Sequence, residues 1–599
     1  MKLRESPKIF ENYKCDYPKN TIKRIEGGFK KIGLEISYYE TRVSYLDEAI
    51  FSGYALIDLL GIIQNGKGIT RLLSKASAYA ELAERFSSGF ILMKIPFPEK
   101  IKKYRELIRD ITDKRFLKGY VRVKDQNIPS LENINRFLQK KINKKQYNIF
   151  RREGVFDVLV DAYSLVKNES VKVPIMFIER KSASTGLAAG NTLEEAIAQA
   201  SFEIFERYCA NKIVYEKIVC STINPDTIEN KKIQSYLKMF KSLNIDVLIK
   251  DFTLGNKLPT IGILFINNNI EKDDNELKKR LHYQRIKVAS HCNLNEAILR
   301  CFTEYVQNTS TEELIKRENL DVLYNYWIKV LNKKYIGVDD EFKYFTRFSD
   351  YYGDLSFLKR GKVISFKKLK SVTTDDSLKD VEIVKNICIE NNWDMLVVDY
   401  THKIIGFPTV RVIIPPISTD YDNFIKKYDK IESFEEKFNK FYGIDNFLYY
   451  IKSNEWIHNK NKIQDLIKNL EDYLSRELPY YNIFLTRENN FQQFVNLLHI
   501  LPFLYLSLDM KKEALDYFKF LLKLKMKPPY KSSFFRYLFL SKYNPDIYKR
   551  CIYLLQHSID KNTDLNFELR SNPFKYEVVE DNLENIYCTM LKIINNSFI

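Results

Sequence analysis

Several patterns that would assign a protein to a class are missing from this chain of 599 residues. No apolar run approaches the ~18 residues needed to cross a bilayer, and the N-terminal stretch MKLRESPKIFENYK has no apolar signal-peptide core. The eight cysteines form no C-x-x-C or C-x-x-H pair, which argues against a zinc ribbon and a disulfide framework. We therefore expect a soluble, cytoplasmic protein with reduced thiols and no membrane partner.

The common catalytic motifs are missing as well. There is no G-x-G-x-x-G after an apolar strand, no H-E-x-x-H and no G-x-S-x-G, and the six histidines are scattered. The stretch Gly66-Lys67-Gly68 is not a Walker A loop, because that loop needs Ser or Thr directly after the lysine. A lysine in a Gly-rich turn before a helix can still contact a phosphate, although a surface turn without a ligand is commoner.

Positive charge is in excess, with a formal net charge of +18. The lysines are spread along the whole chain together with abundant Asn, Ile, Tyr and Phe, which is typical of an AT-rich genome, and no basic run alternates with aromatic residues. We therefore expect no direct, sequence-specific contact with nucleic acid. The positive charge would still help docking to an acidic partner such as a ribosome.

The most informative feature that is present is an E-x-x-E-R pattern, which occurs twice. The two copies and a third cluster of similar character are, in order, Glu81, Glu84 and Arg85; Glu203, Glu206 and Arg207; and Arg300, Glu304 and Gln307. Apolar residues recur at helical spacing around each cluster, so carboxylates three residues apart share one helix face. Glutamates that close repel one another unless a cation holds them, which favours a bound divalent metal. The alternative, a charged helix face with ion pairs along it, explains one copy better than two.

Apolar patterning divides the chain into an α+β part and a helical part. Before the first acidic cluster we expect a strand, a Gly-rich turn and then a helix. The segment VPIMFIERKSASTGLAAGNTLEEAIAQASFEIFER repeats this order with an apolar strand, a loop rich in Ser, Gly and Ala, and a helix that has Thr192 as N-cap and Glu195 at capping-box spacing. Further buried strands are expected in IDVLIKDFT, in PTIGILFINN and twice in WDMLVVDYTHKIIGFPTVRVIIPPIS. We assign residues 1–430 to one α+β domain and residues 435–599 to an all-helical, TPR-like domain.

Four segments together resemble the YcaO family in motif, order and spacing. They are GKGITRLLSKASAYAELAER, GLAAGNTLEEAIAQASFEIFERY, NEAILRCFTEYVQ and VVDYTHKIIGFPTVRVIIPP. The resemblance covers roughly residues 40–430, with its motif core at 60–420. With its helical extension, the chain resembles the long stand-alone bacterial members, which carry a TPR-like domain and are named as accessory factors for methylthiolation of a small-subunit ribosomal protein.

The resemblance implies a non-P-loop ATP site, with ATP and Mg²⁺ as ligands. Characterised peptide-modifying members phosphorylate a backbone amide oxygen, after which a side-chain or sulfide nucleophile adds to the amide and yields azolines or thioamides. Carried over by motif, the implied ATP contacts are Lys67, Ser77, Asn191, Glu195, Gln199, Arg207, Arg300 and Glu304. The implied Mg²⁺ ligands are Glu81, Glu84, Glu203 and Glu206.

Three departures from the family pattern bear on the function. Ala188 stands where a serine often precedes the E-x-x-x-Q motif by seven residues, Pro415-Pro416 replaces the usual Pro-Gly, and the P-x-P-x-P ending of azoline-forming members is absent. The missing ending favours the accessory-factor branch over a peptide thioamide or azoline synthetase. A non-catalytic nucleotide-binding scaffold is a third hypothesis. The partners implied by the resemblance are a second copy in a homodimer, a radical methylthiotransferase, and a ribosomal protein or the ribosome.

Overall fold

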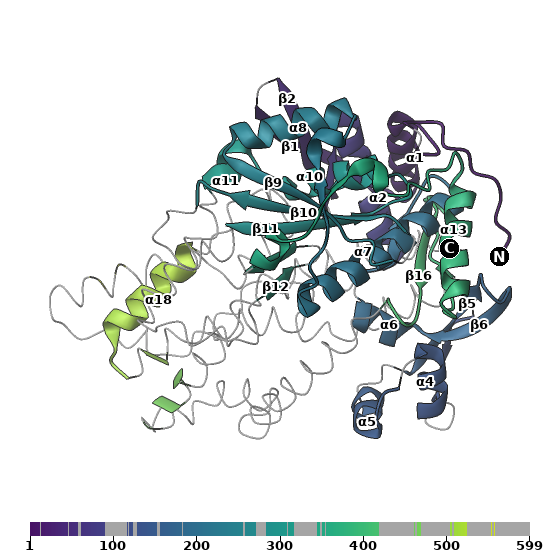
Figure 1. The fold of residues 1–599 in the computed structure, drawn as a ribbon. Coiled ribbons are helices and arrows are strands. Elements are labelled where there is room, and N and C mark those ends of the chain that lie inside the picture. The colour runs from purple at the N-terminus through teal and green to yellow at the C-terminus, as the bar shows by residue number, and fades with distance from the viewer. Residues whose placement is uncertain are drawn as a thin grey trace.

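The computed structural model describes residues 1–89 and 117–418, with internal gaps that include 58–61, 271–282 and 317–343, and beyond 418 mainly residues 508–523. Among the helices in these parts of the chain, none combines the length and the apolar character needed to cross a membrane. Three β-sheets organise the described residues, and helices pack between and around them (Figure 1). Helices and strands both contribute throughout, as the α+β prediction requires.

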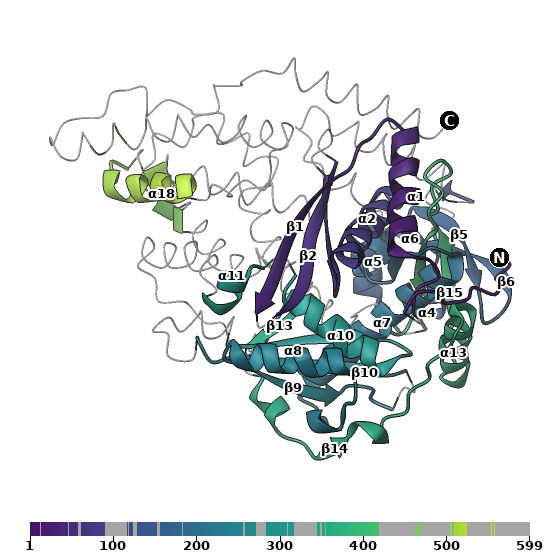
Figure 2. The same ribbon diagram turned by 90° about the horizontal axis from the view of Figure 1, so that it is seen from above.

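An antiparallel sheet near the N-terminus supports the first acidic helix. Its strands pair in the order β1-β2-β3, helix α2 packs on β3 and β2, and helix α1 packs on α2. Figure 2 shows this sheet beside helices α8 and α10, which contact β2. The bounds are α1 Pro18–Lys31, β1 Ser37–Tyr45, β2 Glu48–Ile57, β3 Ile62–Gly68 and α2 Arg71–Ser87. Thr70 caps α2, since its hydroxyl accepts a hydrogen bond from the Leu73 N–H at 3.2 Å.

A seven-stranded sheet forms the second layer. Its order is β12-β13-β11-β10-β9-β8-β14, antiparallel except for the pair β8–β14, and it contains both strands expected around residues 245–267. Helices α8 and α10 pack on one face, and α11 follows α10 in the chain. The bounds are β8 Thr222–Asn224, α8 Lys231–Ser242, β9 Ile245–Asp251, β10 Thr260–Asn267, β11 Gln284–Ser290, α10 Leu294–Tyr305, α11 Thr311–Lys316, β12 Tyr344–Arg347, β13 Asp350–Gly353 and β14 Val363–Ser365.

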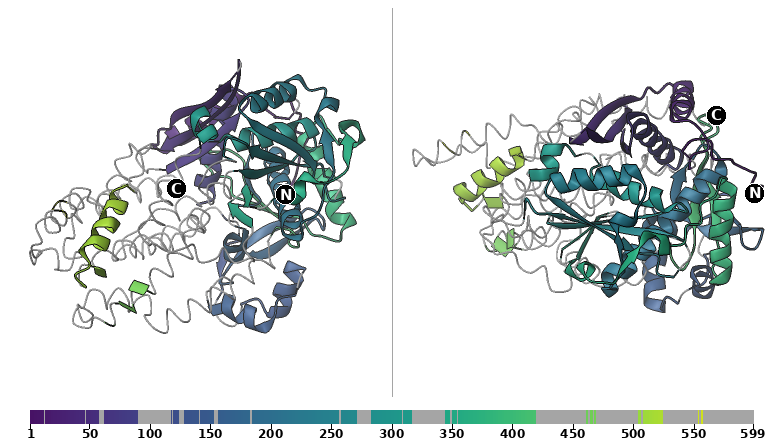
Figure 3. Two further views of the ribbon diagram at one scale, coloured as in Figure 1. Left: turned by 60° about the vertical axis from the view of Figure 1, so that its left-hand side comes forward. Right: turned by 45° about the horizontal axis from the view of Figure 1, so that its top comes forward.

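A six-stranded sheet forms the third layer, with the order β4-β5-β15-β16-β7 and β6 paired to β5. Alternate residues of its strands pack on opposite faces, so one face meets α7 and α13 while the other meets α4, α5 and α6. Figure 3 shows α4 and α5 in blue at the margin of the molecule. The bounds are β4 Val121–Arg122, α4 Leu131–Leu138, α5 Lys144–Arg152, β5 Val158–Ser164, β6 Glu169–Pro174, α6 Ile175–Ser182, β7 Leu187–Ala189, α13 Ser377–Glu390, β15 Leu396–Asp399 and β16 Thr409–Ile413.

Helix α7, Leu193–Glu216, lies between the two large sheets. It contacts β16 and β7 on one side and β11 and β10 on the other, so it is apolar around most of its circumference. Thr192 caps it as predicted and accepts a hydrogen bond from the Glu195 N–H at 3.1 Å. The carboxylate of Glu195 does not close a capping box with Thr192. It accepts instead from the Cys15 N–H at 3.0 Å.

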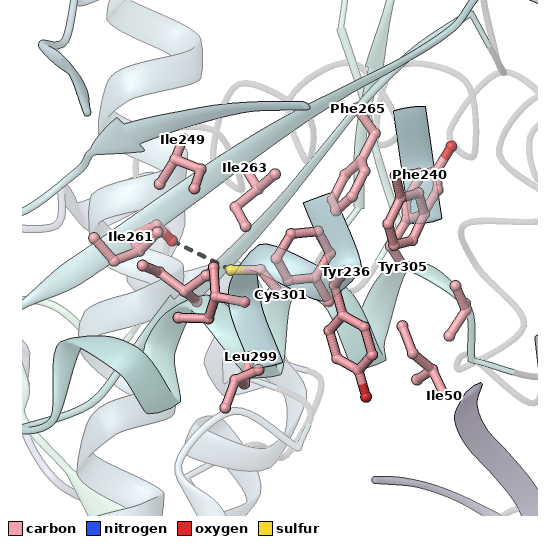
Figure 4. Packing of buried hydrophobic residues seen from close by; sticks show 14 of the residues in the cluster. Ile50, Tyr236, Phe240, Ile249, Ile261, Ile263, Phe265, Leu299, Cys301 and Tyr305 are labelled. Carbon is pink, nitrogen blue, oxygen red and sulfur yellow. Dashed lines mark hydrogen bonds between the residues drawn. The ribbon is translucent and has the colours of Figure 1, made fainter. Parts of the chain in front are cut away.

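Aromatic packing fixes helix α10 on the seven-stranded sheet. The rings of Phe265 in β10 and Tyr305 in α10 stack at 3.8 Å between centroids, and Phe240 of α8 packs beside both (Figure 4). The thiol of Cys301 donates to the Ile261 carbonyl at 3.6 Å, which ties α10 directly to β10. These contacts hold the C-terminal turn of α10 at a defined place relative to the sheet.

The Gly-rich turn predicted before the first acidic helix is wrong. Gly66 and Gly68 lie in strand β3. These positions need glycine because α2 packs so closely on the strand that a Cβ would clash with it. A Cβ on Gly66 would overlap backbone atoms of Ser74 and Ala78 in α2. Lys67 therefore lies in strand β3 between two glycines that both pack directly on α2.

The predicted C-terminal domain over residues 435–599 lies largely outside the described residues. Within it the structure describes helix α18, Lys511–Lys523, which coincides with the segment DMKKEALDYFKFLLKLK that was expected to be helical. The TPR-like arrangement and the division near residue 430 remain predictions.

We predict that Gly66→Ala lowers the thermal unfolding midpoint by several degrees, because overpacking of a tight contact costs about 1–3 kcal/mol. The added methyl group would push α2 away from β3. Differential scanning calorimetry measures the effect. Gly27→Ala is the matched control: Gly27 lies in α1, and a Cβ there meets nothing within 4 Å. A midpoint for Gly66→Ala equal to that of Gly27→Ala would contradict the close packing.

Candidate functional site

All twelve residues predicted to bind nucleotide or metal line one cavity of about 840 Å³. The set is Lys67, Ser77, Glu81, Glu84, Asn191, Glu195, Gln199, Glu203, Glu206, Arg207, Arg300 and Glu304. They belong to β3, α2, the segment just before α7, α7 itself and α10, so parts of the chain that are far apart in sequence meet here. The structure brings the residues together, while their individual roles as ligands stay predictions.

Each E-x-x-E-R copy holds its arginine by ion pairs within the helix. In α2, Arg85 lies 2.9 Å from Glu84 and 3.3 Å from Glu81. In α7, Arg207 lies 3.5 Å from Glu203. The intrahelical pairs that sequence alone offered as the alternative to a metal are thus present. They are not solvated surface pairs, however, because all five side chains line the cavity and are at least two-thirds covered.

Burial and crowding make two of these carboxylates weak acids. Burial, the largest cause, and the charges of Glu81 and Glu203 together raise the pKa of Glu84 to about 8. Burial also raises the pKa of Glu206 to about 7, with Glu304 as the neighbouring charge that contributes most. Carboxylates from three helices therefore act on one another across the cavity, and a bound cation would relieve this repulsion.

The donor set suits a hard divalent cation. Glu206 Oε2 is buried and accepts no hydrogen bond within the described part of the chain, which is costly unless a ligand supplies the missing interaction. Carboxylate oxygens are the ligands that Mg²⁺ prefers. Among the described residues, no three Asp, Glu, His or Cys side chains converge as a ready-made metal cage. The glutamates thus fit Mg²⁺ in kind, and Glu81, Glu84 and Glu203 would turn from their arginines to reach it.

Lys67 and Glu304 join strand β3 to helix α10. Their ion pair is 2.7 Å long, and the Lys67 ammonium also donates to Gln307 Oε1 at 3.5 Å. Burial alone would raise the pKa of Glu304, but the charges of Lys67 and Lys287 outweigh burial and bring it to about 2. Glu304 is therefore ionised and fixes the position of the lysine ammonium in the cavity wall.

Two arginines on different helices face the same cavity. Arg300 of α10 donates from Nη1 to Gln199 Oε1 of α7 at 3.1 Å, which couples the two helices. Arg207 of α7 lines the cavity next to the glutamates of its own helix. Planar guanidinium groups donate two parallel hydrogen bonds to phosphoryl oxygens, so both residues suit a phosphate chain.

Asn191 and Glu195 hold the N-terminal segment. Lys14 forms a 3.2 Å ion pair with Glu195, whose carboxylate also accepts from Asn191 at 3.1 Å. The hydroxyl of Thr21 in α1 donates to Asn191 Oδ1 at 2.7 Å. Asn191 and Glu195, two predicted nucleotide contacts, therefore anchor the N-terminal residues Lys14 and Thr21, which lie about 170 to 180 positions earlier in the sequence.

Sequence reasoning missed several side chains that line the cavity, among them Lys14, Thr21, Arg285 and Lys287. Lys14 and Thr21 precede every motif, and no local pattern marks them. A signal did exist for the other two, because Q-R-I-K-V-A-S places two cations at strand spacing in a segment that is otherwise suited to a buried strand.

Comparison with known proteins gives a family and several distant relatives. The model of the YcaO family, described as an ATP- and Mg²⁺-binding cyclodehydratase, matches residues 65–418, more than half of the chain. An uncharacterised protein of Haemophilus influenzae is 24% identical over 259 residues, which are 42% of this chain and 41% of that protein. The ribosomal protein S12 methylthiotransferase accessory factor YcaO of Escherichia coli is 30% identical over 101 residues, 17% of each chain. The matched regions therefore span less than half the length of these two relatives.

Among solved structures, YcaO from Methanopyrus kandleri bound with AMPPCP and Mg²⁺ has a TM-score of 0.43 and 16% identity to this chain. The match covers 69% of this chain and 95% of that one.

We predict that Glu81→Gln and Glu203→Gln each weaken ATP binding by about tenfold or more when Mg²⁺ is present, because an amide oxygen carries no charge to offset the cation. Isothermal titration calorimetry with Mg²⁺ and ATP measures the affinity. Glu216→Gln changes an exposed residue at the far end of α7 and should bind ATP as the unchanged protein does. If both cavity variants keep the original affinity, the metal assignment is wrong.

We also predict that Arg207→Lys lowers nucleotide affinity or turnover by about tenfold, which corresponds to ~1.4 kcal/mol. Lysine keeps the charge but cannot offer two parallel donors to one phosphoryl group. Titration with the nucleotide and steady-state phosphate release measure the two quantities. Arg136→Lys, at an exposed pair with Glu132 on α4, is the control. Unchanged behaviour of Arg207→Lys would make Arg207 a purely structural ion-pair residue.

Proposed function

Because the chain belongs to the YcaO family, we propose that it is an ATP- and Mg²⁺-dependent enzyme that activates a backbone amide by phosphorylating the amide oxygen. We propose further that it supports methylthiolation of a small-subunit ribosomal protein as an accessory factor. The observation that carries the first part is the convergence of all twelve motif residues on one cavity. The name of the Escherichia coli relative, a methylthiotransferase accessory factor, supports the second part.

The residues divide the work by their chemistry. Glu81, Glu84, Glu203 and Glu206 would hold Mg²⁺, which when bound supplies positive charge next to the triphosphate. Arg207 and Arg300 approach from different helices and would hold phosphoryl oxygens from two directions. Gln199 already holds Arg300 before a ligand arrives, whereas the glutamates would exchange their arginine partners for the cation on binding.

Lys67 would contact the phosphate chain as a point charge. Its ammonium is held by the ionised Glu304, and its strand packs directly against α2 at Gly66 and Gly68. Ser77 lies on the cavity side of α2 and would add a hydroxyl donor. This arrangement replaces the glycine-rich loop of P-loop proteins with a strand and a helix.

A peptide backbone thioamide or azoline synthetase is the second candidate, and the description of the family as cyclodehydratases favours it. Both enzyme candidates release phosphate when a suitable polypeptide is present. A nucleotide-binding scaffold, the third candidate, would bind ATP without substrate-dependent release.

The partners and the domain division belong to the proposal. We propose as partners a second copy in a homodimer, a radical methylthiotransferase, and a ribosomal protein or the ribosome. The name of the Escherichia coli relative agrees with the last two. The ATP-binding domain over residues 1–430 would carry the chemistry. The helical domain over residues 435–599 would recruit a partner.

The accessory role predicts that the chain restores methylthiolation of ribosomal protein S12 in a bacterial strain that lacks its own YcaO accessory factor. Mass spectrometry of the isolated ribosomal protein measures the modified fraction. Glu203→Gln should restore little modification, whereas Glu216→Gln should restore as much as the unchanged chain, because only the first removes a predicted metal ligand. Modification that stays at the level of the empty vector with the unchanged chain, despite normal expression, would contradict the accessory role.

Phosphate release with candidate peptides then separates a synthetase from a scaffold.

A further inference from the structure

Strand β11 carries two cations although it is buried along its whole length. Arg285 is 8% exposed and Lys287 is 5% exposed. Residues two apart in a strand share a face, so both side chains leave the sheet on the side of Ala289, where α8 and α10 pack. A strand that is covered on both faces is normally apolar throughout, and burying a cation is costly unless it has a partner.

Both side chains line the candidate cavity, at its end near the C-terminus of α10. The Arg285 guanidinium lies 5.5 Å from the centroid of the Tyr305 ring, which is a cation–π contact. Lys287 acts on Glu304, since its charge helps to lower the pKa of that carboxyl group. Lys67 forms its 2.7 Å ion pair with the same carboxylate. Three cations from β3 and β11 therefore surround one end of the cavity.

A buried lysine with a structural role looks different in the same sheet. Lys250 in β9 is fully buried, and its ammonium donates to Thr222 Oγ1 at 2.6 Å and to the Arg360 carbonyl at 2.7 Å. It holds β8 and the segment before β14 in place and does not line the cavity. Arg285 and Lys287 differ from Lys250 in their location, because both line the cavity.

We propose that Arg285 and Lys287 form an oxyanion-binding subsite at this end of the cavity, next to Lys67. Guanidinium and ammonium groups donate charge-assisted hydrogen bonds to carboxylate and phosphate oxygens, and these bonds are strongest in a largely buried site. Neither residue belongs to the motifs that carry the ATP and Mg²⁺ assignment. The subsite deepens the proposed function and rests on it for the identity of the oxyanion.

The proposed reaction supplies one such oxyanion. The bond between the γ-phosphorus and the bridging oxygen of ATP breaks, and a bond from that phosphorus to the amide oxygen forms, leaving ADP. When the nucleophile has added to the amide carbon, the bond from carbon to that oxygen breaks, and inorganic phosphate leaves with the former amide oxygen. The subsite would receive this phosphate. A carboxylate of the polypeptide substrate offers the same chemistry, and an experiment with two anions separates the sources.

The test titrates the full-length protein, first without nucleotide and then saturated with ADP and Mg²⁺, with inorganic phosphate and separately with acetate. Isothermal titration calorimetry measures both affinities. Lys287→Met and, as a second variant, Arg285→Gln should weaken anion binding by about tenfold or more, and Lys287→Arg should recover most of it because the charge returns. Lys241→Met removes an equal charge from the exposed side of α8 and should leave anion binding unchanged. A thermal melt of each variant confirms that it is folded.

Saturable phosphate binding that depends on Arg285 and Lys287 supports a product subsite, and saturable acetate binding with the same dependence supports a substrate carboxylate. Binding of neither anion, or binding that folded variants of both residues leave intact, overturns the proposal. Failure of ADP to bind is a separate outcome. It contradicts the proposed function, while the titration without nucleotide still decides whether the subsite exists.

Discussion

The burial of helix α7 between two sheets is the constraint on which the site depends. Strands β16 and β7 cover one side of the helix, β10 and β11 cover another, and α13 also packs on it. Glu195, Gln199, Glu203 and Glu206 follow one another at intervals of three or four, so they share one stripe of the helix, and this stripe lines the cavity. Burial keeps water from the Glu206 carboxylate, and its raised pKa is the direct consequence.

Helix α2 supplies the second cluster of glutamates in the cavity. Glycines in β3 set the distance between this helix and the sheet. Gly66 lets the helix backbone touch β3, which brings the cavity side of α2 and the Lys67 ammonium to the same wall. A strand with larger residues would move the helix and widen the cavity between the two glutamate clusters. The packing of α2 on the sheet β1-β2-β3 thus contributes to the distance between the two glutamate clusters and Lys67.

Local patterns were sufficient for much of this architecture, while the resemblance to the YcaO family supplied the set of residues that line the cavity. Helical spacing placed both E-x-x-E-R copies on helices, and alternation or apolar runs identified β9, β10, β15 and β16. The glycines around Lys67 misled the prediction, because a glycine required by close packing looks the same in sequence as a glycine required by a turn. Arg285 and Lys287 were overlooked for a different reason: Q-R-I-K-V-A-S does place two cations in a segment suited to a buried strand, but the cavity that they line also needs residues of α7 and α10, which are distant in sequence.

Glu195 illustrates where motif transfer and physical contacts must be combined. The resemblance assigns it to ATP, yet its buried carboxylate is already engaged by Lys14 and by the Cys15 N–H. Burial would raise the pKa of Glu195, but these donors outweigh burial and hold the pKa below its usual range, so the carboxylate is ionised before any ligand arrives. A nucleotide that uses Glu195 therefore either shares it with Lys14 or displaces the lysine. In both cases the N-terminal segment is part of the site, because the Glu195 carboxylate both anchors Lys14 and Cys15 and is the predicted ATP contact.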